Sequence, residues 1–269
     1  MRATGSWYEV LYGEKILSCR MRGKLRLRGV RSTNPIVVGD TVVCECGEDG
    51  EWIIVDIAPR RNYIIRRASN LSEQSHILAA NVDMCLLIVT INYPETSTTF
   101  IDRFLATAEA YRIPVHIVFN KVDRYDDAER RYLEAIVHLY RTIGYDCSCV
   151  SALNNEGLDE VRAALSGKTT LLSGNSGVGK STLINALLPN LSLRTAEISE
   201  RHNTGMHTTT FSEMFPFGEN GWLIDTPGVK GFGTFDMEEE EIGHYFREIF
   251  AISADCRYGN CTHTHEPHC

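Results

Sequence analysis

A glycine-rich segment from Gly174 to Thr182 carries the clearest chemistry in the chain. It completes the pattern G-x-x-x-x-G-K-[ST], whose backbone amides surround a phosphate group. Lys180 is expected to contact the β and γ oxygens of a nucleotide, and Ser181 is expected to ligate Mg²⁺. The residues expected to bind nucleotide here are Gly174, Asn175, Ser176, Gly177, Val178, Gly179, Lys180, Ser181 and Thr182.

Two further groups of polar residues each follow a short apolar segment typical of a buried strand. Residues 115–119 run into Asn120, Lys121, Val122 and Asp123, and residues 147–150 run into Ser151 and Ala152. The carboxylate of Asp123 can accept from N1–H and from the exocyclic amine of guanine, whereas adenine would leave it desolvated and unpaired. We expect Asn120 to brace the pocket, Lys121 to lie along the base plane and the amide of Ala152 to donate to O6. Together the two groups predict a guanine-nucleotide site.

Residues suited to sensing a γ-phosphate lie downstream. The apolar segment 222–224 ends in Asp225, Thr226, Pro227 and Gly228, which match Asp-x-x-Gly. Asp225 is expected to hold Mg²⁺ through water, and the amide of Gly228 is expected to contact the γ-phosphate. Of the threonines at 208–210, Thr209 is expected to close on Mg²⁺ when that phosphate is present. The alternative interpretation of the threonine run is an exposed strand edge.

The position after Gly228 bears on catalysis. Many GTP-hydrolysing proteins place a glutamine there to orient the attacking water, but this chain has Val229, which cannot hydrogen-bond to water. The nearest polar candidate is His207, whose ring could orient or polarise that water. The alternative is that His207 only packs within its loop. Hydrolysis by the chain alone is therefore expected to be slow.

The C-terminal segment holds a set of metal ligands. Cys256, Cys261, His263 and Cys269 form one Cys₃His set, which suits tetrahedral Zn²⁺. His265 and His268 also have suitable spacings, so the pattern alone leaves the imidazole ligand open. Because so short a segment buries little core, one zinc ion is expected to supply its folding free energy. The alternative is that the three cysteines bind no metal.

The elements that must position these groups alternate from residue 82 onward. Strands are expected at 84–90, 115–119, 147–150, 169–173 and 222–224, and helices at 100–111, at 128–143 and after the glycine-rich segment. This alternation predicts an α/β fold with a parallel sheet and helices on both faces. The chemistry is then expected at the carboxyl ends of the strands.

Composition sets broader limits. A chain of 269 residues has room for about two or three domains, and its nine cysteines are expected to be reduced. With 43% hydrophobic residues it has no apolar run near the roughly 18 residues needed to span a bilayer. No export signal is apparent at its N-terminus. We expect a cytoplasmic monomer without membrane association.

Residues 1–67 differ from the rest in charge and in pattern. They hold 12 lysines and arginines against 8 aspartates and glutamates, although the whole chain has a formal charge of −8. Strand-like runs at 7–12, 16–19, 37–46 and 52–57 favour a small closed β-barrel. Between the second and third runs lies a basic stretch, Arg20, Arg22, Lys24, Arg26, Arg28 and Arg31. A barrel with such a stretch is typical of contact with nucleic-acid phosphates, the alternative being a solvated loop. Residues 68–81 are expected to form a linker.

The motifs occur in an unusual order, with the guanine-specificity motif first, the phosphate loop second and the γ-phosphate sensor last. This order predicts a circularly permuted GTPase, because a sheet can be reopened at another surface connection. With these motifs the chain resembles the ribosome small subunit-dependent GTPase A family (RsgA, also called YjeQ). Further resemblance lies in Arg22-Gly23-Lys24, Gly39-Asp40, the run 77–83, Ile101-Asp102-Arg103 and the C-terminal cluster.

The resemblance implies an N-terminal OB-fold at 1–67, a circularly permuted P-loop GTPase domain at 68–235 and a zinc-binding domain at 236–269. It implies a GTP hydrolase that binds GTP or GDP with Mg²⁺, and it favours His263 as the imidazole ligand of zinc. Such a protein would act in late maturation of the small ribosomal subunit and bind its rRNA, and the subunit would stimulate its GTP hydrolysis. Two departures are Met206, where related sequences often carry Arg or Gln, and the end at Cys269, which predicts a truncated zinc-binding domain.

The alternative from a different class is a GTP-dependent RNA-binding switch whose hydrolysis is incidental. An RNA- or DNA-processing enzyme powered by GTP is disfavoured, because the sequence offers no second catalytic constellation. Large stimulation of turnover by small ribosomal subunits would favour the enzyme over the switch.

Overall fold

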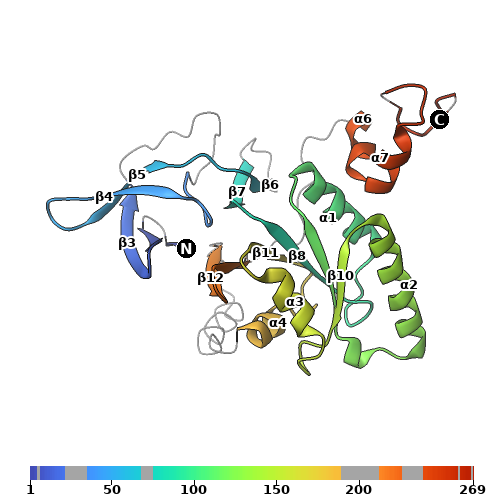
Figure 1. The fold of residues 1–269 in the computed structure, drawn as a ribbon, viewed down its shortest axis with the longest axis horizontal. Coiled ribbons are helices and arrows are strands. Elements are labelled where there is room, and N and C mark those ends of the chain that lie inside the picture. The colour runs from blue at the N-terminus through green and yellow to red at the C-terminus, as the bar shows by residue number, and fades with distance from the viewer. Residues whose placement is uncertain are drawn as a thin grey trace.

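The structure is a computed structural model that describes residues 1–4, 7–21, 35–67, 75–188, 212–225, 239–259, 261–267 and 269. N-terminal strands lie at one end of the molecule in Figure 1, an α/β unit lies in the middle, and short C-terminal helices lie above it. Among the described residues, no helix has the length and apolar character needed to cross a membrane.

The central unit is built on a mostly parallel sheet. Its strands are β8 (Met84–Val89), β9 (Val115–Asn120), β10 (Asp146–Val150), β11 (Thr169–Ser173), β12 (Glu213–Phe217) and β13 (Gly221–Asp225). They lie in the order β10-β9-β8-β11-β13-β12, and all neighbours are parallel except β12 and β13. The expected α/β class and parallel sheet are confirmed.

Helices cover both faces of this sheet. The helices are α1 (Thr98–Ala110), α2 (Asp127–Ile143), α3 (Leu158–Leu165) and α4 (Lys180–Leu187), with the short 3₁₀ helix η1 (Val122–Arg124) between β9 and α2. Successive residues of β8 alternate between two buried clusters: Leu87 packs in the cluster that contains α1 and α2, and Leu86 in the one that contains α3 and α4. A strand buried on both faces explains the unbroken apolar run at this position.

The boundaries of α2 follow local signals. Asp126 accepts hydrogen bonds from the backbone N–H groups of Ala128 and Glu129, and the Glu129 side chain returns to the Asp126 backbone, which completes a capping box. At the other end Gly144 adopts φ 102°, a conformation that favours glycine and ends the helix where the sequence predicted.

The N-terminal strands form a curved continuation of the sheet. They are β1 (Arg2–Thr4), β2 (Trp7–Tyr12), β3 (Lys15–Met21), β4 (Val42–Cys46) and β5 (Trp52–Ile57), in the order β1-β2-β3-β5-β4, and β1 pairs with β12. Tyr8, Cys19, Ile36 and Ile54 form their own small core. The expected strand over 37–46 begins only at Val42, because the Asp40 carboxylate accepts from the N–H of Val37 at 2.8 Å and holds residues 37–40 in a turn.

The expectation of a linker at 68–81 is wrong for its second half. Ser75–Ala80 form strand β7, which pairs with β6 (Tyr63–Arg67) in a separate two-stranded sheet. Ile77, Ala79 and Ala80 are buried, and the N–H of Ala80 donates to the carbonyl of Val38 at 2.9 Å. Small side chains made this segment resemble a linker, yet small side chains are what allow the backbone to pack this closely.

The C-terminal segment folds into α6 (Glu239–Ile242), the 3₁₀ helix η3 (Gly243–Tyr245) and α7 (Arg247–Ser253). Arg247 attaches it to the central unit: its guanidinium donates to Glu109 at 2.7 Å and to the carbonyl of Gly144 at 2.5 Å, and lies 4.1 Å from the centre of the Tyr145 ring. Because Tyr145 directly precedes β10, this attachment lies at the amino ends of the parallel strands, away from the carboxyl ends (Figure 1).

Candidate functional site

The carboxyl ends of four parallel strands bring the predicted motifs to one edge of the sheet. Val150 at the end of β10 lies in register with Asn120 at the end of β9, and Leu172 near the end of β11 lies in register with Asp225 of β13. The glycine-rich segment follows β11 directly. Segments far apart in sequence therefore meet where a bound nucleotide is expected.

Asn120 connects three of these segments. Its side chain is 2% exposed; its amide donates to the carbonyl of Val178 in the phosphate loop at 2.9 Å, and its oxygen accepts from the N–H of Ala152 at 3.1 Å. This arrangement matches a bracing role. The N–H of Ala152, for which the sequence predicts donation to guanine O6, donates to Asn120 in this nucleotide-free structure. Ser151, fully buried, accepts from the N–H of Asn154 at 3.2 Å.

Asp123 has an unused acceptor that fits guanine. Its Oδ1 atom is buried and has no hydrogen-bond partner among the described residues. A buried carboxylate oxygen without a donor is costly, so this atom is matched to a ligand that brings N–H groups. The N1–H and exocyclic amine of guanine are such donors, and adenine lacks this pair. The observation supports guanine as the base that this pocket takes.

Lys121 lies between the base motif and the phosphate loop. Its ammonium donates to the carbonyl of Gly177 at 2.6 Å and to the carbonyl of Tyr93. Burial lowers the pKa of Lys121, and Arg124 lowers it further, while Asp123 opposes the shift. The aliphatic stem of Lys121 is thus fixed beside the pocket, in line with the expected place along a base.

Two tyrosines of the site were missed by sequence reasoning. Tyr93 lies in the loop after β8 and supplies a carbonyl to Lys121. The Tyr125 hydroxyl donates to the carbonyl of Asn120 at 2.6 Å and accepts from the N–H of Ile91 at 2.9 Å, and burial raises the pKa of Tyr125 to about 12. Tyr125 follows Asp123 by two residues, which is the only local signal that could have identified it.

The phosphate loop is shaped by glycines whose places no other residue could take without strain. Gly174 has φ 149°, and a Cβ there would meet the carbonyl oxygen of Ile88 at 2.3 Å. Gly179 has φ 95°, and a Cβ there would meet the side-chain nitrogen of Asn120 at 2.4 Å. The loop leads into α4, whose N-terminus points its free backbone N–H groups toward the loop. Val178 is buried, whereas Ser176, Gly177, Ser181 and Thr182 are exposed, and Asn175 is partly buried.

Lys180 curves back over the loop. Its ammonium donates to the carbonyls of Gly174 at 2.6 Å and Asn175 at 2.8 Å. Burial lowers the pKa of Lys180, and the nearby carboxylate of Asp225 opposes that shift. Lys180, expected at the phosphate oxygens, and Asp225, expected to hold Mg²⁺, are therefore electrostatic neighbours. The remaining predicted residues of this site, His207, Thr209 and Gly228, lie outside the described residues.

The C-terminal ligands form a compact group. One donor atom from each of Cys256, Cys261, His263 and Cys269 lies within 4.8 Å of the others. His263 Nδ1 is 3.6 Å from the sulfur of Cys256 and 3.3 Å from that of Cys269. Three thiolates and one imidazole at these separations fit tetrahedral Zn²⁺, with metal–ligand bonds of about 2.0–2.3 Å. His265 is not in the group, and His268 lies outside the described residues, so the geometry favours His263.

Comparison with known proteins identifies the family. The model of the RsgA GTPase family matches residues 57–235, and that of the RsgA N-terminal domain matches residues 1–54. The chain belongs to the RsgA family. A small ribosomal subunit biogenesis GTPase RsgA from Phocaeicola vulgatus is 66% identical over 100% of this chain and 87% of its own length. The corresponding protein of Bacteroides fragilis is 63% identical with the same coverage.

Solved structures of the family share the fold. YjeQ from Thermotoga maritima superposes with a TM-score of 0.74 at 32% identity, covering 98% of this chain and 84% of that one. YloQ, described as a circularly permuted GTPase, superposes with a TM-score of 0.73 at 32% identity, covering 99% and 83%. The predicted circular permutation of the GTPase fold is thereby confirmed for this RsgA family member.

Removing zinc should unfold the C-terminal segment and spare the nucleotide site. Among the described residues, none of the four ligands belongs to a hydrophobic core cluster that could replace the metal, whereas the base and phosphate residues belong to the separately packed sheet. We expect chelation to release one zinc per chain and to make residues after about 240 protease-sensitive, with GDP affinity changed less than about twofold. Metal analysis, limited proteolysis and GDP titration test this. Absence of zinc in protein purified without chelator would contradict it.

Proposed function

We propose that this chain hydrolyses GTP during maturation of the small ribosomal subunit. The observation that carries the proposal is the buried Oδ1 of Asp123, which has no partner among the described residues and lies at the same sheet edge as the phosphate loop. Guanine recognition and phosphate binding then occur on one nucleotide. The names of the relatives, small ribosomal subunit biogenesis GTPases, support the choice of partner.

The proposed division of labour follows the strand ends. Asp123 accepts from guanine, with Asn120, Lys121, Ser151 and Ala152 shaping the pocket around it. Residues 174–182 surround the phosphates, and Lys180 exchanges its two carbonyl partners for phosphate oxygens. Ser181, Thr209 and Asp225 would hold Mg²⁺, which would supply positive charge beside the phosphates. Gly228 donates its backbone N–H to the γ-phosphate. Release of that phosphate after hydrolysis changes the state of the segment that contains Gly228.

The other modules are proposed to hold the subunit. Residues 1–67 bind rRNA through phosphate contacts of the basic stretch, residues 68–235 hydrolyse GTP, and residues 236–269 bind one zinc ion. The basic stretch from Arg22 to Arg31 lies outside the described residues, so its role rests on the sequence. We further propose that the chain acts as a monomer in the cytoplasm.

Turnover with and without partner tests the proposal. GTP hydrolysis should be slow for the chain alone and should rise by at least tenfold when purified small ribosomal subunits are added, because Val229 leaves the water-orienting position without a polar group. Large subunits serve as the matched control and should not stimulate. Equal rates with and without small subunits would remove this function and favour the alternative of an RNA-binding switch.

Replacing Arg22, Lys24, Arg26 and Arg28 with alanine should weaken subunit binding and flatten its salt dependence. Each lost phosphate contact should reduce the slope of log affinity against log salt by close to one unit. GTP hydrolysis without subunits should stay within about twofold, since the nucleotide residues are untouched. Binding titrations at several salt concentrations measure the slope. An unaltered slope would mean that these cations are only a solvated surface.

His207→Ala should abolish the stimulated part of turnover and leave GTP affinity nearly unchanged. The imidazole is the nearest polar side chain that the sequence offers for orienting the water, and loss of such a group typically costs about 10²–10⁴-fold in rate. Single-turnover hydrolysis with saturating subunits measures the effect, and His265→Ala is a control in a histidine outside the metal group. Full stimulation of the His207 variant would assign the water-orienting role to the ribosome.

A further inference from the structure

The N-terminal domain is joined to the GTPase sheet by a short strand pairing. Arg2 of β1 lies in register with Glu213 of β12, and the N–H of Met214 donates to the carbonyl of Met1 at 3.0 Å. The guanidinium of Arg2 is 3.7 Å from the carboxylate of Glu213, with both side chains about a third exposed or less. Because β2 pairs with β1, the N-terminal strands continue the GTPase sheet through this one junction.

The strand that receives β1 occupies a particular place in the chain. β12 begins three residues after the threonine run at 208–210, and its hairpin partner β13 ends at Asp225, the first residue of the Asp-x-x-Gly pattern. Both segments that the proposed function assigns to the γ-phosphate are thus covalently continuous with this hairpin. A shift of either segment is expected to act directly on the strand that holds β1.

A second attachment holds the N-terminal domain to a part of the sheet far from those segments. The side chain of Asn81 donates to the carbonyl of Gly39 at 2.8 Å and accepts from the N–H of Arg61 at 2.9 Å. Arg61 donates to Asp83 at 2.8 Å, and Asp83 accepts from the N–H of Thr169 at 2.8 Å. These bonds reach the amino ends of β8 and β11, which carry none of the γ-phosphate residues.

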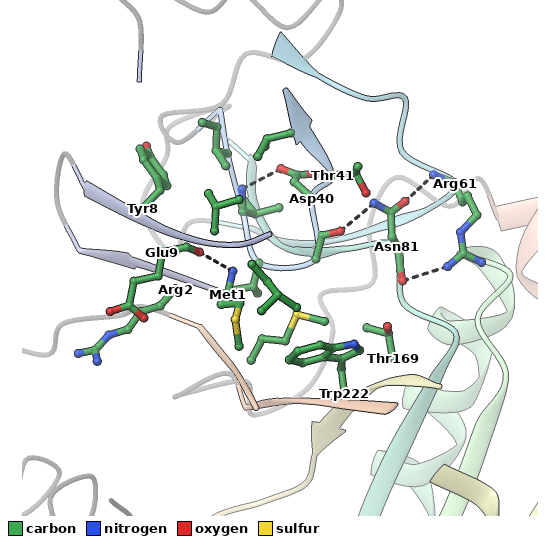
Figure 2. Close-up of a pocket in the computed structure, with 18 of the residues that line it drawn as sticks. Met1, Arg2, Tyr8, Glu9, Asp40, Thr41, Arg61, Asn81, Thr169 and Trp222 are labelled. Carbon is green, nitrogen blue, oxygen red and sulfur yellow. Dashed lines mark hydrogen bonds between the residues drawn. The ribbon is translucent and has the colours of Figure 1, made fainter. Parts of the chain in front are cut away.

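A cavity of about 570 Å³ separates the two attachments. Figure 2 shows Met1 and Arg2 on one side of it, Asn81 and Arg61 on the other, and Trp222 of β13 along its base. Close-packed interiors move as units, whereas a cavity lets two contacts move independently. The junction at β1 can therefore shift while the contacts of Asn81 and Arg61 stay in place as a pivot.

We propose that the pairing of β1 with β12 transmits the nucleotide state to the N-terminal domain. Movement of the β12–β13 hairpin on exchange of GTP for GDP displaces β1, and the N-terminal domain rotates about the attachment at Asn81. The orientation of its RNA-binding surface, and hence its affinity for the subunit, depends on the γ-phosphate. This inference rests on the proposed function. By linkage, subunit binding must change GTP affinity relative to GDP by the same factor.

A charge-reversal cycle tests the junction. For the full chain, affinity for purified small subunits is measured with a non-hydrolysable GTP analogue and with GDP, and the ratio of the two is the coupling. Arg2→Glu and Glu213→Arg each place like charges across the junction, and each should reduce the ratio by about threefold, while the double reversal restores it. GTP affinity without subunits should stay at the parent value in all three variants.

A backbone variant gives a stronger version of the same test. Met214→Pro removes the N–H that donates to Met1, whereas Met214→Ala keeps it and is the matched control. The proline variant should bring the ratio close to one, and the alanine variant should keep it. If the parent ratio is already one, nucleotide-dependent subunit binding fails as a whole. If the parent protein shows coupling and the charge reversals and Met214→Pro leave it intact, the proposed route through β1 is overturned, but nucleotide-dependent subunit binding is not.

Discussion

Asp123→Asn should lower the affinity for GTP by about 100-fold and create affinity for xanthosine triphosphate. The buried Oδ1 of Asp123, without a partner in the part of the chain that the structure describes, is the acceptor for guanine N–H groups, and hydrogen bonds to a charged group contribute about 1.5–3 kcal/mol each. An asparagine amide presents a donor where guanine also presents donors. Xanthine has an oxygen at C2, which can accept from that amide. Titration of both nucleotides measures the exchange of preference.

Stability without nucleotide gives this prediction a second, opposite readout. Because none of the described residues donates to the buried Oδ1 of Asp123, the neutral asparagine should leave the unfolding free energy of the nucleotide-free protein unchanged or raise it. Asp127→Asn is the matched control, since Asp127 is exposed at the start of α2 and has no place in the pocket. It should keep the parent preference for GTP. A similar loss of GTP affinity in both variants would exclude a specific role for Asp123.

The sheet and its motifs were predictable because their signals are local. β9 is buried along its whole length and β11 over its last four residues, and each polar motif begins where its strand ends. The same holds for the zinc group, whose four ligands lie within 14 residues of sequence. Local patterns of this kind determine which edge of the sheet carries the chemistry.

Contacts between distant segments could not be predicted in this way. Arg247 docks the C-terminal helices on Glu109, which is 138 residues earlier, and no spacing rule relates the two. The N–H of Ala152, which follows β10, donates to the side chain of Asn120 at the end of β9. α7 is attached at the amino ends of the parallel strands, although only residues 226–246 separate it from Asp225 at the carboxyl end of β13.

The two local errors have a common physical origin. At residues 37–40 a single carboxylate, Asp40, competes with strand pairing for the backbone N–H of Val37. Ser75–Ala80 form a strand because they pair with β6, and the backbone at Val38 forms a bridge to Ala79. In both places a tertiary or side-chain contact outweighs the intrinsic preference of the segment.

Gly179→Ala should nearly abolish binding of both GTP and GDP. Residue 179 has φ 95°, which costs an alanine about 1–2 kcal/mol in backbone strain. The added Cβ would also lie 2.4 Å from the side-chain nitrogen of Asn120, which must then move. That nitrogen donates to Val178, and the oxygen of the same side chain accepts from Ala152, so its displacement disturbs the phosphate loop and the base pocket together. We expect a loss of at least about 100-fold in affinity.

Gly218→Ala separates steric displacement from backbone strain. Gly218 has a positive φ of 55° in the turn between β12 and β13, but a Cβ there would meet no atom within 4 Å. The control should therefore lose about 1 kcal/mol of stability and keep its nucleotide affinity. If Gly179→Ala retains parent affinity, Asn120 does not brace the two halves of the site. If Gly179→Ala loses nucleotide affinity while Asn120→Ala does not, Gly179 acts through its own backbone conformation. We expect both Gly179→Ala and Asn120→Ala to lose nucleotide affinity while Gly218→Ala keeps it, because the Asn120 side chain holds the base pocket and the phosphate loop in register.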